Sequence, residues 1–340
     1  MKYFGIRATL GWLTLLSASI NANANDYSVA VLNEALVFPG TTLLTDLSNF
    51  HRQAIVEVDM KGKVVWRHEP FIPSKSFLLD ATYLDNDRIL YTVKGYGIFE
   101  IDQSGKVHWQ HKDSGVSHDA DRLANGNTLY NRSWVSKGED VVREISSSGE
   151  IVWSWSGLEA FDKPPFNSVY DEGWMHVNSV SRLPSGNTLI SIRNFNTIVE
   201  ISPAGSVVRS WTFKSDNART TSTSGVITGE RNHEPEMLEN GNILVALRNP
   251  FRYVEFNPTS QEIAWQWQPP NEGFLLRYNR EANRLPNGNT LVTTGNQIVE
   301  VTQSGEVVWK LNGAYRTSVG DLRVFHKAIR RGLDGKIYGD

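Results

Sequence analysis

Short runs of alternating apolar and polar residues dominate the chain, and one short phrase recurs with a polar turn at its centre. Its five copies are LDNDRIL at 84–90, LANGNTL at 123–129, LPSGNTL at 183–189, LENGNIL at 238–244 and LPNGNTL at 285–291. Asn-Gly between apolar runs is a strong hairpin signal, because a two-residue turn needs positive φ at its central positions. The phrase therefore predicts five β-hairpins with two-residue turns.

A second phrase alternates with the first and reads as strand, turn and strand. Its six copies are IVEVDMKGKVVW, IFEIDQSGKVHW, VREISSSGEIVW, IVEISPAGSVVRSW, VEFNPTSQEIAW and IVEVTQSGEVVW. Together the two phrases give four short antiparallel strands per unit, and successive turns lie between 43 and 56 residues apart. This period is typical of β-propeller blades. We therefore predict an all-β fold, a six-bladed β-propeller of four-stranded antiparallel blades.

The two ends of the chain are complementary. The first unit lacks an innermost strand, and the C-terminal RVFHKAIRRGLDGKIY supplies one, so we expect the ring to close by pairing of the N- and C-terminal segments. An open sandwich of hairpins would explain neither the repeat nor these ends. The repeated Trp66, Trp109, Trp153, Trp211, Trp265 and Trp309 are expected to pack between blades.

Two connections are longer than the repeat requires, at residues 157–175 and 214–232. Each runs from the last strand of one blade to the first strand of the next, and each leads directly into a histidine. Long loops in compact domains are often functional, which directs attention to the starts of the innermost strands.

Hairpin register predicts which polar residues meet at those starts. Opposed residues in a two-residue hairpin have numbers with a constant sum, which places Asn178 opposite Arg193, His233 opposite Arg248, and His118 opposite Ser133. His176 precedes Asn178 by two positions and points the same way. The expected rim of the central channel therefore carries His118, His176, Asn178, Arg193, His233 and Arg248, with Arg280 from the sixth blade and His326 or Lys327 from the closing strand.

These side chains form a donor-rich, cationic set that suits a tetrahedral oxyanion such as sulfate or phosphate. One histidine can act as a nucleophile and another as a proton donor. Two other interpretations stay open: a single histidine at a strand start is often structural, and a histidine-rich metal site would use the same residues. The arginines repel cations and no acidic residue occupies these slots, so we expect no metal.

Composition and the N-terminal sequence limit the classes of function and the cellular location that we expect. The chain has 340 residues, a formal net charge of −3 and no Cys; nucleic-acid binding would need a concentrated basic face, which is missing, and thiol catalysis is excluded. Residues 1–24 are expected to be a signal peptide, with basic Lys2 and Arg7, an apolar stretch at 8–20 and Ala22-Asn23-Ala24 before cleavage. A buried N-terminal helix is the alternative. Residues 25–340 would then be a periplasmic or secreted propeller that does not associate with the membrane.

Three segments resemble the bacterial arylsulfate sulfotransferases (arylsulfotransferase, ASST), six-bladed propellers of the periplasm. They are GWMHVNSVSRLPSGNTLISIRN, RNHEPEMLENGN and SHDADRLANGN. The resemblance extends over roughly residues 30–340 and is most specific in the His-x-Asn and Arg of the first segment.

The resemblance implies a role for five residues. His233 would attack sulfur and become a sulfohistidine, His176, Asn178 and Arg193 would hold the sulfuryl oxygens, and His118 would assist by hydrogen bonding and proton transfer. The reaction would be a ping-pong transfer from an aryl sulfate donor to a phenolic acceptor, with no cofactor and no metal. Arg248, Arg280 and His326 are expected to contact the substrate.

Two departures from the family pattern keep alternatives open. Better-known members carry an extra N-terminal domain and a disulfide, for which this chain has neither the length nor the cysteines. We therefore expect a monomer rather than a dimer, in a short form of the family. The alternatives are a non-catalytic periplasmic propeller that binds an anionic ligand or a protein partner, and a quinone-cofactor dehydrogenase, which would need eight blades and acidic metal ligands.

Overall fold

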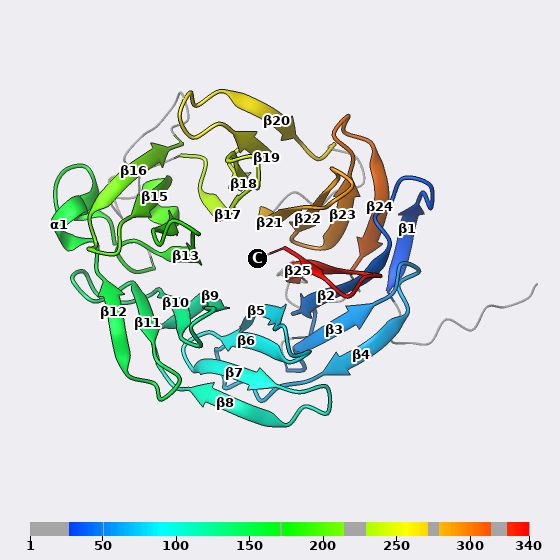
Figure 1. Ribbon diagram of the computed structural model, residues 1–340, viewed down its shortest axis with the longest axis horizontal. Helices are drawn as coiled ribbons and strands as arrows, with labels where there is room; N and C mark the ends of the chain where they lie inside the picture. The colour runs from blue at the N-terminus through cyan, green and yellow to red at the C-terminus, as the bar shows by residue number, and fades with distance from the viewer. Residues whose placement is uncertain are drawn as a thin grey trace, which may run out of the picture.

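The structure is a computed structural model. It describes residues 27–49, 51–170, 172–213, 229–270, 279–313 and 325–339. Their strands form six antiparallel sheets arranged radially around one axis (Figure 1). The predicted six-bladed β-propeller is confirmed, and the number of blades differs from the eight expected of a quinone-cofactor dehydrogenase.

Each blade runs outward from the axis. Blade one contains β25 (Phe325–Gly332), β2 (Gly40–Asp46), β3 (Ala54–Val58) and β4 (Val64–His68), with the short β26 (Ile337–Tyr338) beside β25. Blade two contains β5 (Leu78–Tyr83), β6 (Ile89–Val93), β7 (Gly97–Ile101) and β8 (Val107–His111). Blade three contains β9 (Val116–Arg122), β10 (Thr128–Arg132), β11 (Val142–Ile145) and β12 (Ile151–Trp155).

The other three blades repeat this order. Blade four contains β13 (Val177–Arg182), β14 (Thr188–Ile192), β15 (Thr197–Ile201) and β16 (Val207–Thr212). Blade five contains β17 (Asn232–Met237), β18 (Ile243–Arg248), β19 (Phe251–Phe256) and β20 (Ile263–Trp267). Blade six contains β21 (Asn279–Arg284), β22 (Thr290–Thr294), β23 (Gln297–Val301) and β24 (Val307–Asn312), with β1 (Ser28–Leu32) on its outer edge. The short helical elements are α1 (Leu158–Phe161), η1 (Phe166–Ser168) and η2 (Arg193–Phe195).

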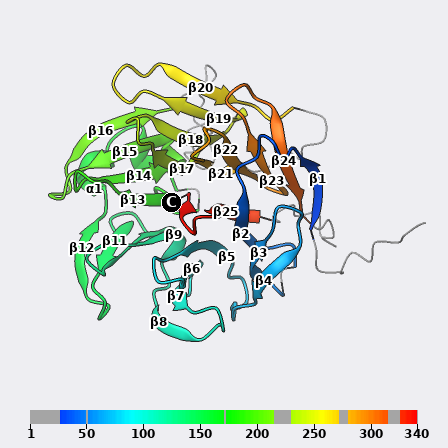
Figure 2. The same ribbon diagram turned by 45° about the vertical axis from the view of Figure 1, so that its right-hand side comes forward.

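The ring closes at two places. The C-terminal β25 pairs with the N-terminal β2, with Leu43 opposite Ile329, as the sequence predicted; Figure 2 shows the red strand beside the blue one. In addition, β1 pairs with β24 on the outside of blade six, a second closure that the sequence did not predict. Both ends of the chain therefore hold neighbouring blades together.

The repeated tryptophans join each blade to the next, as predicted, and they do so by hydrogen bonding as well as packing. Trp153 donates its indole N–H to the carbonyl of Pro203 at 2.9 Å, in the outer turn of the following blade. The other five make the same bond: Trp66 to Gln103, Trp109 to Ser147, Trp211 to Pro258, Trp265 to Gln303 and Trp309 to Met60. A repeated sequence position thus provides a repeated inter-blade contact.

The innermost hairpins differ from the prediction by one residue. The amide of Leu183 bonds to the carbonyl of Asn187, the amide of Gly186 bonds to the carbonyl of Leu183, and φ of Gly186 is 85°. These contacts define a three-residue loop, a type I turn followed by a left-handed glycine, rather than a type I′ turn. This loop needs positive φ at the glycine alone, whereas a type I′ turn centred on Ser185-Gly186 would also need it at Ser185. The same two bonds recur at Gly126 and Gly241, in hairpins that contain no proline.

The long connection at residues 157–175 carries α1 and η1 and packs by Phe161, Trp174 and Met175 into the core between blades three and four. Most of the other one, 214–232, lies outside the described residues, as does the expected signal peptide. Within the described ranges, no helix is long and apolar enough to cross a membrane.

Candidate active site

Every innermost strand carries a register irregularity near the end where the blade begins. On the innermost strands the shifts lie between Leu78 and Asp80, Val116 and Ala120, Val177 and Ser179, His233 and Glu236, Asn279 and Glu281, and Phe325 and Ala328. An extra residue on one strand of a pair is a β-bulge, and bulges re-aim side chains next to functional sites. Six bulges at corresponding positions therefore shape one region at the axis.

The bulges bring neighbouring residues of one strand to the axis, where a regular strand would send them to opposite faces. Two groups result. The histidine cluster consists of His118, His233, His326 and Arg280. The carboxylate cluster consists of Asp80, Asp119, Glu234, Glu281 and the single cation Lys327. All of these except Asp80 directly follow a member of the histidine cluster in the sequence.

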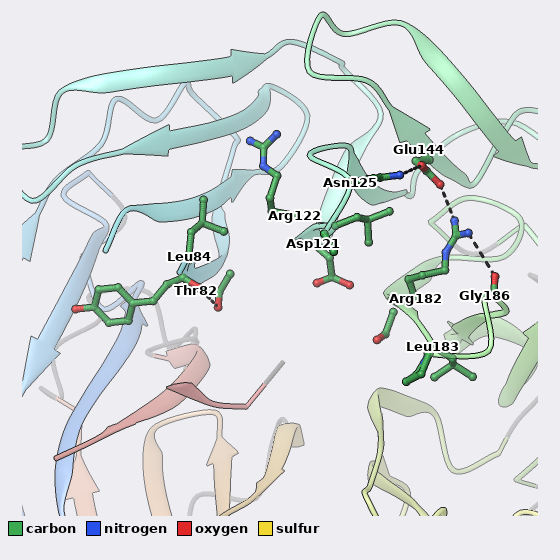
Figure 3. A pocket seen from close by; sticks show the side chains of 14 residues that line it. Thr82, Leu84, Asp121, Arg122, Asn125, Glu144, Arg182, Leu183 and Gly186 are labelled. Atoms are coloured by element: carbon green, nitrogen blue, oxygen red, sulfur yellow. Dashed lines mark hydrogen bonds and ion pairs between the residues drawn. The ribbon is translucent and has the colours of Figure 1, made fainter. Parts of the chain in front are cut away.

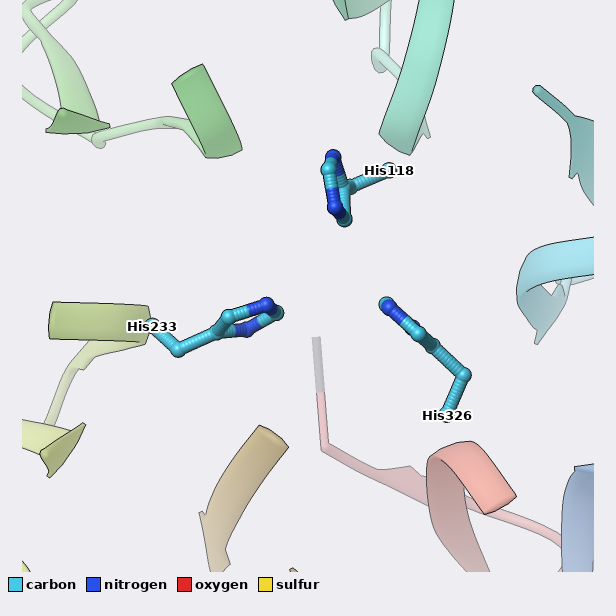
Figure 4. Close-up of side chains that lie close together, drawn as sticks. All are labelled: His118, His233 and His326. Carbon is cyan, nitrogen blue, oxygen red and sulfur yellow. The ribbon is translucent and has the colours of Figure 1, made fainter. Parts of the chain in front are cut away.

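The three imidazoles of the histidine cluster come from β9, β17 and β25 and face a common centre (Figure 4). Ring centroids are 5.7 Å apart for His118 and His233, 5.4 Å for His118 and His326, and 5.6 Å for His233 and His326. All three residues are buried. Residues far apart in the sequence thus provide three nitrogen-bearing rings around one point.

Arg280 determines which ring nitrogen of His233 is unprotonated. Its Nη1 lies 3.3 Å from Nε2 of His233. A guanidinium can only donate hydrogen bonds, so Nε2 of His233 accepts and carries no proton. The lone pair of that nitrogen is therefore directed at the guanidinium of Arg280.

His176 lies beside the cluster, with its ring 5.2 Å from that of His118 and 4.6 Å from that of Trp134. Its Nδ1 bonds to the backbone carbonyl of Glu172 at 3.0 Å, and the Glu172 carboxylate pairs with Arg193 at 2.9 Å. Glu172 belongs to the long connection that precedes blade four. That loop therefore reaches the site and places a carboxylate on the predicted anion-binding arginine.

Burial keeps the imidazoles neutral. The pKa values of His118, His176 and His233 are lowered well below the usual range, first by desolvation and then by nearby positive charge, from Arg280 for His118 and His233 and from Arg193 for His176. A neutral imidazole has a free lone pair and is a competent nucleophile. The same positive charge favours binding of an anion.

The structure changes the predicted pairings. His233 lies opposite Ala246, and the partners of Val177 and Val116 are Ile192 and Arg132. The three predicted oppositions are wrong, because the hairpin loops are one residue longer than expected and the bulges shift the strand starts further. The site residues nevertheless lie together, because the error in register shifts each residue along its own strand and leaves it near the same end of the central channel.

The remaining predicted residues lie around the cluster in different ways. Asn178 donates to the carbonyl of Asn232 at 3.1 Å. Arg248 ends β18, and its charge lowers the pKa of His118 and His233. Lys327 does not join the histidines; it lies 3.0 Å from Asp80 and 3.5 Å from Asp119.

Two acidic residues of the site, Glu172 and Glu234, were not predicted from the sequence. No acidic residue occupies the strand positions that the assumed hairpin register brings to the rim, and Glu172 lies in the connection before β13. The available signal was adjacency: Glu234 directly follows His233, and Asp119 directly follows His118. A bulge turns adjacent residues to the same side of the strand, and the sequence does not predict where a bulge occurs.

The three histidines also present a geometry that could hold a metal ion, since one ring nitrogen of each lies within 4.8 Å of the others. The chemistry fits poorly. Arg280 already donates to Nε2 of His233, so a cation would compete for that lone pair next to a fixed positive charge.

A groove of about 620 Å³ lies at the hairpin ends of blades two to four (Figure 3). Its wall contains the pair between Arg182 and Glu144 at 2.8 Å and the bond from Arg182 to the carbonyl of Gly186 at 3.4 Å. The pair with Glu144 joins blades three and four, whereas the bond to Gly186 lies within the β13–β14 hairpin of blade four. The groove is at the opposite end of the inner strands from the histidine cluster and contains none of its residues.

The sequence matches the profile of the arylsulfotransferase (ASST) family over residues 29–217, which is more than half of the chain. The chain belongs to the ASST family. The matched segment includes His118, His176, Asn178 and Arg193, whereas the other four predicted site residues follow it. Membership of this family supports a sulfotransferase-type function.

Similar solved structures share the propeller architecture. A protein of unknown function from Bacteroides caccae is 18% identical, with a TM-score of 0.62 over 85% of this chain and 98% of that one. A streptogramin B lyase is 13% identical (TM-score 0.56, 93% and 90% covered), and the virginiamycin B lyase of Staphylococcus aureus is 12% identical (0.52, 88% and 88%). At these identities the likeness concerns the fold alone. No curated protein matched the sequence.

Proposed function

We propose that this chain is an aryl-sulfate sulfotransferase that moves a sulfuryl group from an aryl sulfate to a phenol through a sulfohistidine at His233. One observation carries the proposal: the unprotonated Nε2 of His233 lies 3.3 Å from the guanidinium of Arg280, among buried histidines. A nucleophilic lone pair and an anion-binding group thus meet at one point.

The first half-reaction uses these two groups together. Nε2 of His233 forms a bond to sulfur while the bond from sulfur to the aryl oxygen breaks, and the electron pair leaves on that oxygen. Arg280 shifts from Nε2 to a sulfuryl oxygen, and the charges of Arg193 and Arg248 lie close enough to lower the pKa of the histidines. Fixed positive charge directed at the sulfuryl oxygens stabilises the transition state without reorganisation.

We assign proton exchange with the phenolic oxygen to His118. Its Nδ1 lies 2.5 Å from Oγ of Ser117. When Nδ1–H donates to that hydroxyl oxygen, Nε2 of His118 is left to accept the proton of an incoming phenol. The protonated ring returns that proton to the next aryl oxygen that leaves, so protons balance over one full cycle.

The N-terminal sequence also indicates the compartment in which the enzyme acts. Residues 1–24 have the pattern of a signal peptide, so we infer that the enzyme acts in the periplasm or after secretion. An aryl sulfate donor that carries its own activated sulfuryl group suits a compartment where nucleotide donors are scarce.

Turnover of 4-nitrophenyl sulfate tests the proposal. We expect release of 4-nitrophenol that depends on added phenol, and a loss of roughly 10⁴-fold or more in His233→Ala, because removal of a nucleophile removes the covalent pathway. The matched control is His51→Ala, an exposed histidine outside the site, which should keep the wild-type rate. Wild-type protein that binds aryl sulfates without any turnover would instead identify an anion-binding propeller.

A further inference from the structure

Glu234 directly follows His233, and the local backbone aims both side chains at the axis. The register of β17 against β18 shifts between His233 and Glu236, and φ of Glu234 is 43°. A residue other than glycine at positive φ is strained, and such strain persists where the surroundings enforce it, often at functional sites. The strand thus departs from regular geometry at the point that places Glu234 beside the imidazole.

In this protonation state, the Nδ1–H group of His233 needs a hydrogen-bond acceptor. Since Arg280 donates to Nε2 and the ring is neutral, the single ring proton is on Nδ1. Nδ1 is buried and has no hydrogen-bond partner among the described residues. Oε1 of Glu234 lies 3.6 Å from it, too far for a hydrogen bond but within reach of a small side-chain rotation.

The other carboxylates of the cluster have a different function. Asp119 accepts the backbone N–H of Val180 at 2.8 Å, and Glu281 accepts that of Ala328 at 2.8 Å, each in the next blade. Asp80 does the same with Ala120 at 3.3 Å. These bonds hold neighbouring blades together, whereas the contact of Glu234 within the described part of the chain is with Nδ1 of His233.

The surroundings make Glu234 an unusually basic carboxylate. Its side chain is only 11% exposed. Burial raises the pKa of this carboxyl group well above its usual range, and the negative charges of Asp119, Glu281 and Asp80 raise it further, while Lys327 opposes them. A carboxylate of this kind accepts a proton from an imidazole more readily than an exposed one.

We propose that Glu234 is the positioning residue of His233, which accepts a hydrogen bond from Nδ1–H and takes up that proton when Nε2 bonds to sulfur. The inference rests on the proposed function and assigns the nucleophilic nitrogen. As the N–S bond forms, the ring becomes positively charged, and transfer of the Nδ1 proton to Glu234 neutralises it. When the sulfuryl group leaves for a phenol, Glu234 returns the proton and the S–N electron pair goes back to Nε2.

Two substitutions of Glu234 separate its role as a hydrogen-bond acceptor from its role as a proton acceptor. Glu234→Gln keeps a carbonyl oxygen that can accept the hydrogen bond but cannot take the proton, and Glu234→Met removes both. The matched control is Glu281→Gln, which removes the same charge from the same cluster, while the new amide oxygen can still accept the N–H of Ala328.

Nitrogen-15 NMR of the histidine rings tests positioning without any substrate, and the resonances of His233 are assigned by their loss in His233→Ala. We expect wild-type protein to show the Nδ1–H form of His233 with a slowly exchanging proton. Glu234→Gln and Glu281→Gln should keep the slow exchange, and Glu234→Met should lose it. Unchanged exchange in Glu234→Met would overturn the assignment of Glu234 as the partner.

Single-turnover release of 4-nitrophenol tests the proton transfer. We expect both Glu234 variants to be slower than Glu281→Gln by roughly 100-fold, the usual contribution of a positioned base. Equal rates in all three would overturn the proton-accepting role. A wild-type protein without any turnover would refute the proposed function, and the NMR result would then still decide whether Glu234 positions His233.

Discussion

At the residue scale, the site depends on histidines that stay neutral because they are buried and because cations surround them. His118 illustrates the balance: burial lowers its pKa most, and the charges of Arg280 and Arg193 lower it further. The same arrangement that favours a nucleophilic imidazole therefore costs stability whenever the solution is acidic enough to protonate histidines in the unfolded chain.

This cost predicts a pH dependence of the free energy of unfolding. The unfolded chain binds protons at its histidines near pH 6.5, whereas the folded values lie well below. Stability is therefore fully present above about pH 6.5 and falls as the pH is lowered toward the folded values, by at most about 1.4 kcal/mol per pH unit for each such histidine.

Urea unfolding between pH 7.5 and 5 measures the effect. His176→Gln removes one of these groups, so its unfolding free energy should fall less steeply with decreasing pH than that of the wild type. His51→Gln, at an exposed position, should keep the wild-type slope. Parallel curves for wild type and His176→Gln would show that this histidine is not held neutral by the fold.

At the scale of single elements, the sequence predicts strands and their order well but fixes their register less well. The alternating phrases identify all four strands of a blade, because each strand has one face toward the next blade. The register prediction failed at LPSGNTL, where a three-residue loop replaces the assumed two-residue turn, and at His233, where a bulge precedes the hairpin. Bulges depend on contacts between blades, which no local pattern encodes.

The repeated tryptophans make a contact between neighbouring blades that can be predicted from the sequence repeat. Trp153 packs at the outer edge of blade three and donates to Pro203 in blade four. Trp153→Phe keeps most of the aromatic surface but leaves that carbonyl without its donor. We expect a loss of about 0.5–1.5 kcal/mol in the free energy of unfolding.

Chemical denaturation measures this loss, with Phe71→Leu as the control because Phe71 is 73% exposed. The control should change stability little. A Trp153→Phe protein as stable as the control would mean that the repeated indole bond contributes nothing to blade association.

At the scale of the whole molecule, closure depends on both ends of the chain. The C-terminal β25 is buried on both sides between β2 and the axis, and it also carries His326 and Lys327. The sequence revealed this closure because one unit lacked an inner strand. It did not reveal β1, whose five residues pair on the outside of blade six and have no counterpart among the described strands of the other blades.

Truncation tests the contribution of the closing strand. Deletion of residues 325–340 removes β25 and should abolish cooperative thermal unfolding, because β2 and β21 then lose their neighbour at the axis. Deletion of 333–340 removes only β26 and the end of the chain and should lower the midpoint by a few degrees at most. Similar midpoints for the two truncations would show that the ring does not need this strand.

The central claim is that His233 carries the sulfuryl group, and the most direct measurement is the mass of the protein after incubation with 4-nitrophenyl sulfate and no acceptor. We predict one added SO₃ group on the intact protein, located at His233 by peptide mapping at alkaline pH, absent from His233→Ala, and removed when phenol is added. An SO₃ group on a different residue, or phenol-dependent transfer without any modified protein, would contradict the account.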